Sequence, residues 1–66
     1  MRIVGEAIRF YRTREGFTQE KLAEKSALHF KYIGLVERGG ANVSLNALRR
    51  IATALKVDLK ELVRDG

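Results

Sequence analysis

The chain has 66 residues, a length that supports one domain and excludes two independent hydrophobic cores. Because it contains no cysteine and one histidine, a disulfide framework and a thiolate or multi-histidine metal site are excluded, and we expect neither a metal nor a cofactor. A net charge of +5 favours an anionic partner such as nucleic acid or an acidic membrane, and equally a charge that only keeps the protein soluble.

A membrane-spanning helix needs about 18 consecutive apolar residues, and no stretch of the sequence approaches that length. The first residues also lack the apolar stretch and the cleavage site of a signal peptide. We therefore expect a cytoplasmic protein without a membrane partner.

An all-α fold of about five short helices is predicted, because the chain has no proline and few runs of β-branched residues. Apolar residues at helical spacing place the helices at residues 3–15, 19–26, 30–38, 45–55 and 59–63. Thr18, Ser44 and Asp58 are expected to cap the second, fourth and fifth helices, since their side-chain oxygens can accept from free backbone N–H groups. Gly16 and the Gly39-Gly40 pair are expected to end the first and the third.

The segment from residue 18 to residue 38 has the pattern of two short helices joined by a tight turn, which is a helix-turn-helix. Ile33 and Val36 are predicted to anchor its second helix to the core. The opposite face then combines cationic, small and apolar residues: Lys31, Gly34, Leu35 and Arg38, with Phe30 at the flank. A helix that presents such a face can enter the major groove of DNA.

The stretches GFTQEKLAEK at residues 16–25 and YIGLVERG at residues 32–39 resemble the phage repressor and Cro-type helix-turn-helix family. The resemblance continues through NVSL at 42–45 and IATALKV at 51–57, and it covers roughly residues 4–63. Within that family the chain looks most like restriction–modification controller proteins, which are small dimeric regulators. The resemblance implies a lambda repressor-like bundle as a single domain over residues 1–66, with the helix-turn-helix at about 18–38 and a dimerisation region at about 45–64.

At positions that match the family, the resemblance implies DNA contacts by Thr18, Gln19, Phe30, Lys31, Tyr32, Leu35, Arg38, Asn42 and Ser44. Gln19 would contact a phosphate or a base edge beside the free amides of its helix, or would merely begin that helix. Lys31 would donate to guanine or to a phosphate, or would be a solvated lysine. Tyr32 would pack its ring, with or without its hydroxyl on a phosphate. Arg38 would contact the DNA backbone or stabilise the helix dipole.

Two of these positions depart from the family pattern. Phe30 and Leu35 stand where relatives often carry polar residues that read bases, and neither side chain can hydrogen-bond a base. Each could contact a thymine methyl group, or form an exposed apolar patch for a protein partner, and Phe30 could simply cover the adjoining helix. Gly34 costs roughly 1 kcal/mol in a helix interior, which close approach to DNA would explain.

Side chains outside the second helix are expected to support it. Arg12 and Glu37 match positions that form an internal ion pair in the family, which would link the first and third helices. Asn42 and Ser44 precede the fourth helix and would form a second phosphate clamp, or act as ordinary loop and cap residues. His29 is expected near a phosphate or at the surface rather than on a metal.

One recognition helix reads too little DNA for specific binding, so a homodimer is expected, with two such helices about 34 Å apart. The candidate interface lies at the C-terminal end of the chain and on the outer side of the fourth helix: Arg49, Val57, Leu59, Leu62 and Val63. The alternative is that the apolar members of this set close the core of the single chain.

We therefore expect a nucleoid-associated transcription regulator that binds a near-palindromic operator in double-stranded DNA and blocks or recruits RNA polymerase. An autoregulatory restriction–modification controller is the specific form that the resemblance implies. An enzyme is not expected, because no Ser-His-Asp or Cys-His set and no glycine-rich phosphate loop occurs, and no small-molecule ligand is indicated. The alternative function is a protein-interaction module, an antitoxin or antirepressor, with the same fold.

Overall fold

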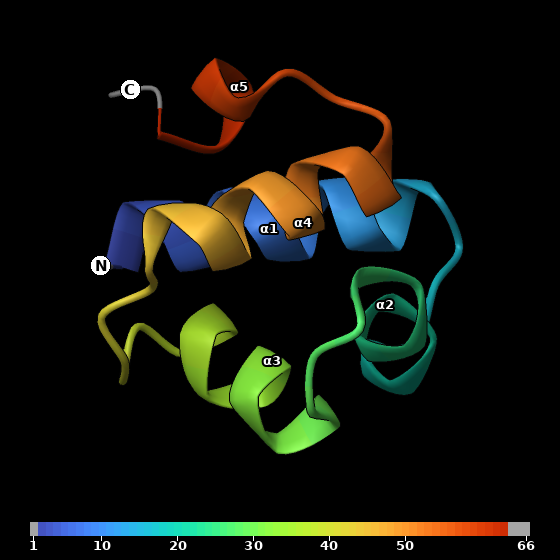
Figure 1. Cartoon of the computed structure of the whole chain (residues 1–66), viewed down its shortest axis with the longest axis horizontal. Helices are drawn as coiled ribbons and strands as arrows, with labels where there is room; N and C mark the ends of the chain where they lie inside the picture. Colours follow the sequence, from blue (N-terminus) through green and yellow to red (C-terminus); the bar gives the residue numbers. More distant parts are fainter. Residues whose placement is uncertain (1, 64–66) are drawn as a thin grey trace.

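Five helices are present in residues 2–63, which are the residues that the computed structural model describes: α1 (Arg2–Arg14), α2 (Gln19–Ser26), α3 (Phe30–Glu37), α4 (Leu45–Leu55) and α5 (Leu59–Val63) (Figure 1). The described part of the chain contains no strand, and the all-α prediction is confirmed. The predicted bounds differ by one residue at both ends of α1 and at the end of α3. Residue 64, the last of the predicted dimerisation region, lies outside the described residues.

Side chains that precede the helices fix where α2, α3 and α4 begin. Thr18 Oγ1 accepts from the Lys21 N–H at 3.0 Å, and Ser44 Oγ accepts from the Ala47 N–H at 3.0 Å, as predicted. His29 caps α3 in the same way, because its Nδ1 accepts from the Lys31 N–H at 3.1 Å. The sequence did not predict this third cap, since Ser, Thr, Asp and Asn are the usual residues there.

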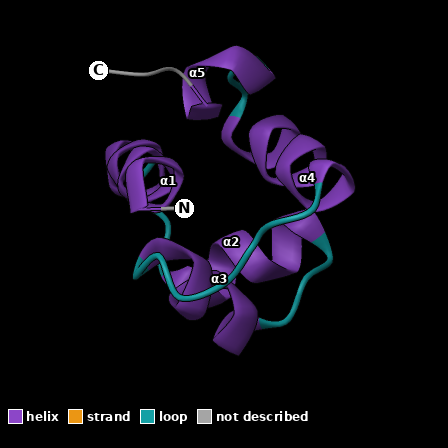
Figure 2. Ribbon diagram, turned by 90° about the vertical axis from the view of Figure 1, so that its left-hand side faces the viewer, coloured by secondary structure: helices purple, strands orange, loops and turns teal. Residues whose placement is uncertain are grey.

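The helices form three levels, as Figures 1 and 2 show from two directions. Helices α1 and α4 lie in the middle, α2 and α3 lie on one side of them, and α5 lies on the other. Contacts join α1 to α3 and α2 to α4, and α5 contacts both middle helices. Within residues 2–63, no helix combines the length and apolar composition that crossing a membrane requires.

A single core receives at least one fully buried aliphatic side chain from each of the five helices: Ile8, Leu22, Ile33, Val36, Ile51, Leu55 and Leu62. Helix α5 is therefore part of the same folded unit as the helix-turn-helix. Leu62 has no exposed surface in the single chain, so its prediction as a dimer contact is wrong, and closing the core is its role.

The turn between α2 and α3 is held from α4. Ala27 adopts a left-handed conformation with φ of 58°, which ends α2. Arg50 then donates from Nε to the Ser26 carbonyl oxygen at 3.0 Å and from Nη2 to the Ala27 carbonyl oxygen at 2.5 Å. These bonds satisfy carbonyl groups that the end of α2 leaves unpaired. The angle at which α3 leaves α2 is thus fixed by a third helix.

Helices α1 and α3 come closest at Gly5. A Cβ atom added there would lie 2.8 Å from the Glu37 carbonyl oxygen and closer still to the Val36 carbonyl oxygen. Only glycine therefore fits at this crossing. The close approach brings α1 alongside the last turn of α3, which carries Glu37 of the candidate site.

Candidate nucleic-acid interface

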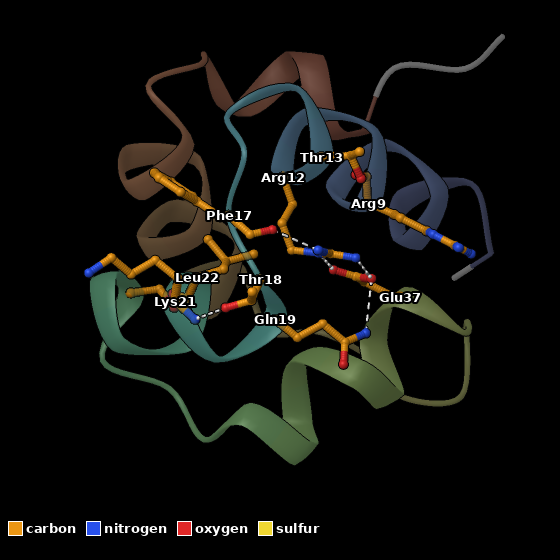
Figure 3. Close-up of polar contacts among 10 residues, drawn as sticks. Arg9, Arg12, Thr13, Phe17, Thr18, Gln19, Lys21, Leu22 and Glu37 are labelled. Atoms are coloured by element: carbon orange, nitrogen blue, oxygen red, sulfur yellow. Dashed lines mark hydrogen bonds and ion pairs between the residues drawn. The ribbon is translucent and has the colours of Figure 1, made fainter.

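An ion pair between α1 and α3 forms the base of the candidate site. Arg12 donates from Nε to Glu37 Oε2 at 2.6 Å and from Nη2 to Glu37 Oε1 at 3.1 Å (Figure 3). Its third donor, Nη1, reaches the Phe17 carbonyl oxygen at 2.8 Å. The Glu37 side chain is only 3% exposed and that of Arg12 is 15% exposed. The predicted internal ion pair is confirmed, and it also ties the turn before α2 to both helices.

Gln19 joins this network from the first turn of α2. Its Nε2 donates to Glu37 Oε1 at 3.1 Å (Figure 3). A carboxylate can only accept hydrogen bonds, so the amide nitrogen, and not its oxygen, must face Glu37. The amide oxygen consequently lies over Gly34, 3.4 Å from the place that a Cβ atom would occupy there. One N–H of the amide stays available for a phosphate or a base edge.

The outer side of α3 carries a shallow hollow of about 400 Å³, which we call the α3 hollow. It is lined by most of the predicted DNA-contact residues of the helix-turn-helix together with one glycine: Gln19, Phe30, Lys31, Gly34, Leu35 and Arg38. Gly34 was predicted on the exposed face, but the residue is buried because the ends of Gln19 and Arg38 cover it. Its missing side chain leaves room for both of those ends.

Charged and apolar side chains alternate around the α3 hollow. Lys31 and Arg38 are exposed, and among the described residues neither is held in an ion pair. Phe30 and Leu35 are 43% and 39% exposed, so both present apolar surface at the hollow that they line. The hollow can therefore offer cationic donors to an anion and apolar surface to a second group at the same time.

The remaining predicted contacts lie outside this hollow. Tyr32 is half-buried and its ring packs against the core. Thr18 and Ser44 are exposed, and each uses its hydroxyl oxygen as a helix cap while keeping its proton for donation. Asn42 is exposed in the loop between α3 and α4. DNA contact by these four residues stays a prediction.

His29 was expected near a phosphate or at the surface, but the sequence did not reveal its part in holding α3 and the hollow. Besides capping α3, its ring stacks on Phe30 with centroids 5.1 Å apart and an interplanar angle of 20°. The signal that could have found it is positional: it directly precedes the first residue of α3, where a side-chain acceptor is needed. It holds the aromatic side of the α3 hollow in place.

The other predicted interface residues divide by exposure. Val63 is 48% exposed, whereas Val57 and Leu59 are half-buried and pack against the core. Arg49 is exposed and lines a separate hollow with Lys25 and Thr53, at the junction of α4 and the end of α2. Val63 therefore offers the largest apolar surface of the predicted set for contact with a second copy.

The sequence of this chain is similar to a known family and to control proteins. A family model described as helix-turn-helix matches residues 8–62. The control protein C.SmaI of Serratia marcescens is 46% identical over 65 residues, covering 97% of this chain and 77% of that protein. The control protein C.BamHI of Bacillus amyloliquefaciens is 40% identical over 62 residues, covering 92% of this chain and 76% of that protein.

A solved structure agrees with these sequence relatives. The crystal structure of the restriction-modification controller protein C.AhdI from Aeromonas hydrophila matches with a TM-score of 0.90 and 44% sequence identity. The match covers 92% of each chain. The resemblance that the sequence motifs indicated is confirmed, both for the fold and for its similarity to controller proteins.

Proposed function

This chain belongs to the helix-turn-helix family, and from that premise we propose that it is a sequence-specific transcription regulator acting as a homodimer. Its target is a near-palindromic operator in double-stranded DNA, and α3 is the helix that enters the major groove. By similarity to the control proteins, its own promoter in a restriction–modification locus is the proposed site of action. Occupancy of the operator then blocks or recruits RNA polymerase.

The observation that carries this proposal is the arrangement of cations on α3. Lys31 and Arg38 are exposed and stand seven residues apart, so about 10 Å of helix separates them. Two turns of helix bring them to the same face, on either side of Leu35. About 10 Å corresponds to roughly three base pairs of duplex.

The rigid mounting of α3 supports the same proposal. Glu37, on the inner side of α3, is bound from α1 by Arg12 and from α2 by Gln19. Arg50 fixes the turn that precedes α3. A helix held from three directions presents its outer side chains in one orientation. Less conformational entropy is therefore lost when α3 binds its target.

A homodimer is proposed because one α3 helix contacts too few bases for specific recognition. The half-exposed Val63 on α5 is the apolar surface that we assign to the pairing. Helix α5 lies on the opposite side of α1 and α4 from α3 (Figure 1), so pairing through it leaves the α3 hollow uncovered.

Selection from a randomised DNA pool, repeated at several salt concentrations, tests the proposal. We expect enrichment of a near-palindrome whose half-sites lie one helical turn, about 34 Å, apart. Lys31→Ala should relax one position in each half-site, while Arg38→Ala should weaken binding to all sequences and flatten the salt dependence. Binding that falls steeply with salt but enriches no sequence would contradict sequence specificity.

A second function has one observation in its favour. Phe30 and Leu35 both expose apolar surface on the α3 hollow, and adjoining exposed apolar surface is a feature of protein-binding sites. In that case the chain would be an antitoxin or antirepressor module that captures a protein through α3. The absence of DNA binding at low salt would favour this function over the first.

A further inference from the structure

We propose that the α3 hollow recognises the C5-methyl group of a pyrimidine base in the major groove, with Phe30 and Leu35 as the residues that determine this specificity. The methyl group can come from thymine or from 5-methylcytosine, which carry it at the same ring position. This inference rests on the proposed function, because it requires α3 to lie in the major groove.

The chemistry of the groove identifies the group. The edges of the base pairs in the major groove display hydrogen-bond donors, acceptors and one apolar group, the C5-methyl. The side chains of Phe30 and Leu35 have no donor and no acceptor. Placed against polar base edges, they would remove water from those edges and return no hydrogen bond, which weakens binding. Against a methyl group, both surfaces lose water favourably.

The hollow has room for a methyl group. Phe30 and Leu35 line it together with Gly34, and the ends of Gln19 and Arg38 occupy the room that the missing Gly34 side chain leaves. Each of these ends lies 3.4 Å from where a Cβ atom of Gly34 would stand. A small group that enters the hollow therefore has the apolar surface of Phe30 and Leu35 beside it.

Both apolar side chains are held in position by their neighbours. The Phe30 ring stacks on His29, which is itself fixed by its hydrogen bond to the Lys31 N–H. Leu35 packs on the backbone of Gly40, where an added Cβ atom would lie 2.8 Å from Leu35 Cδ1. The Gly40 N–H also donates to the Leu35 carbonyl oxygen at 2.9 Å. Binding therefore immobilises little that is not already ordered.

The positive charge beside the apolar pair favours DNA over an apolar protein segment as the occupant of the hollow. The cations Lys31 and Arg38 line the same hollow as the apolar pair. A duplex brings phosphates to both sides of its major groove and the methyl groups between them, so it complements both parts of the hollow. An apolar protein segment would complement only Phe30 and Leu35 and would leave the two cations opposite apolar surface.

The experiment uses the operator duplex obtained by selection and changes single methyl groups. Each thymine is replaced in turn by deoxyuridine, which removes the methyl and leaves the hydrogen-bonding groups of the base intact. Each cytosine is replaced in turn by 5-methylcytosine. We expect at least one position per half-site at which loss of the methyl weakens binding about three- to fivefold, the effect of leaving one methyl group unburied.

The two substitution series separate the two sources of the methyl group. A loss with deoxyuridine identifies thymine, whereas a gain of similar size with 5-methylcytosine identifies a methylated cytosine, and either result supports the proposal. In Phe30→Ala and Leu35→Ala, the affinity for the duplex that carries the methyl group should approach the affinity for the duplex that lacks it, so that their ratio approaches one. Phe10→Ala, which removes an exposed phenylalanine from α1, serves as the control and should keep the wild-type ratio.

Two results would overturn the inference, and they can be told apart. Tight, sequence-selective binding with no effect of any methyl substitution would refute methyl recognition and leave the proposed function standing. Failure to enrich any sequence would refute the proposed function and this inference together. Because the substitutions are made in the DNA, the first result is obtained with the unchanged protein and does not depend on whether a variant folds.

Discussion

Two helical glycines offer a matched test of how α1 and α3 pack. Replacing glycine by alanine in a helix interior favours folding by about 1 kcal/mol when nothing obstructs the new methyl group. At Gly5 the new Cβ meets carbonyl oxygens of α3 at 2.8 Å and less, at least 0.6 Å inside the 3.4 Å at which ordinary van der Waals contact begins. At Gly34 it meets only the ends of two flexible side chains, at 3.4 Å.

The expected signs are therefore opposite. In Gly5→Ala the backbone of α3 must move away from α1, and overpacking of this kind costs about 1–3 kcal/mol. The movement also strains the bond between Arg12 and Glu37, because Glu37 belongs to the displaced turn. We expect a net loss of about 2 kcal/mol for Gly5→Ala. For Gly34→Ala we expect a gain of up to about 1 kcal/mol.

Thermal unfolding followed by far-ultraviolet circular dichroism measures both changes. For a domain of this size, 1 kcal/mol corresponds to about 4–8 °C in Tm, so the Tm values of the two variants should differ by about 8 °C or more. Equal protein concentrations are needed, because a dimer makes Tm depend on concentration. A Gly5→Ala variant as stable as Gly34→Ala would refute the close approach of the two helices.

Three further predictions concern the ion pair, the cap of α3 and the dimer. In urea unfolding, Glu37→Ala should lower the free energy of unfolding by about 3 kcal/mol, because it leaves the mostly buried charge of Arg12 unpaired. The control Glu24→Ala breaks an exposed pair on α2 and should change that free energy by less than about 0.5 kcal/mol. Wild-type stability of the first variant would contradict the assignment of this pair. His29→Ala should lose about 1 kcal/mol, and His29→Asn, which restores an acceptor, should recover it in the same assay; equal losses would show that the cap contributes nothing. Val63→Glu should raise the dimer dissociation constant about tenfold or more in sedimentation equilibrium, because it places a charge in the proposed interface. A wild-type chain that is monomeric at tens of micromolar would disprove the dimer itself.

Local features of the fold could be predicted from the sequence because they depend on neighbouring residues. Thr18 and Ser44 each accept from a backbone N–H three residues further along the chain. The helix bounds likewise depend on interactions between residues close in sequence. The pairing of Arg12 with Glu37 spans 25 residues, and it was predicted through the resemblance to a family rather than from spacing. Periodicity alone cannot choose among the possible partners of a buried charge.

Features that depend on two elements meeting in space were missed or wrong. Gly5 reads in sequence as a weak helix residue, and its purpose appears only where α3 crosses α1. Leu62 was assigned to a dimer interface because apolar residues on a short helix have the same spacing whether they cover their own core or a second copy. The His29 cap is local, two residues from its partner, and was missed for a different reason: preference rules name other residues, although any acceptor of suitable reach can cap a helix.

The contacts of α3 separate the stability of this domain from its specificity. The inner side of the helix carries Glu37, on which the bonds from α1 and α2 converge, while Lys31, Phe30 and Leu35 on the outer side take no part in those bonds. Under the proposed function, substitutions at these three outer positions would therefore change which sequence is read at little cost in stability. Gln19 is the exception, because its nitrogen binds Glu37 and its oxygen lies over Gly34 in the α3 hollow. A change at that residue must alter the mounting of α3 and the surface presented to DNA together.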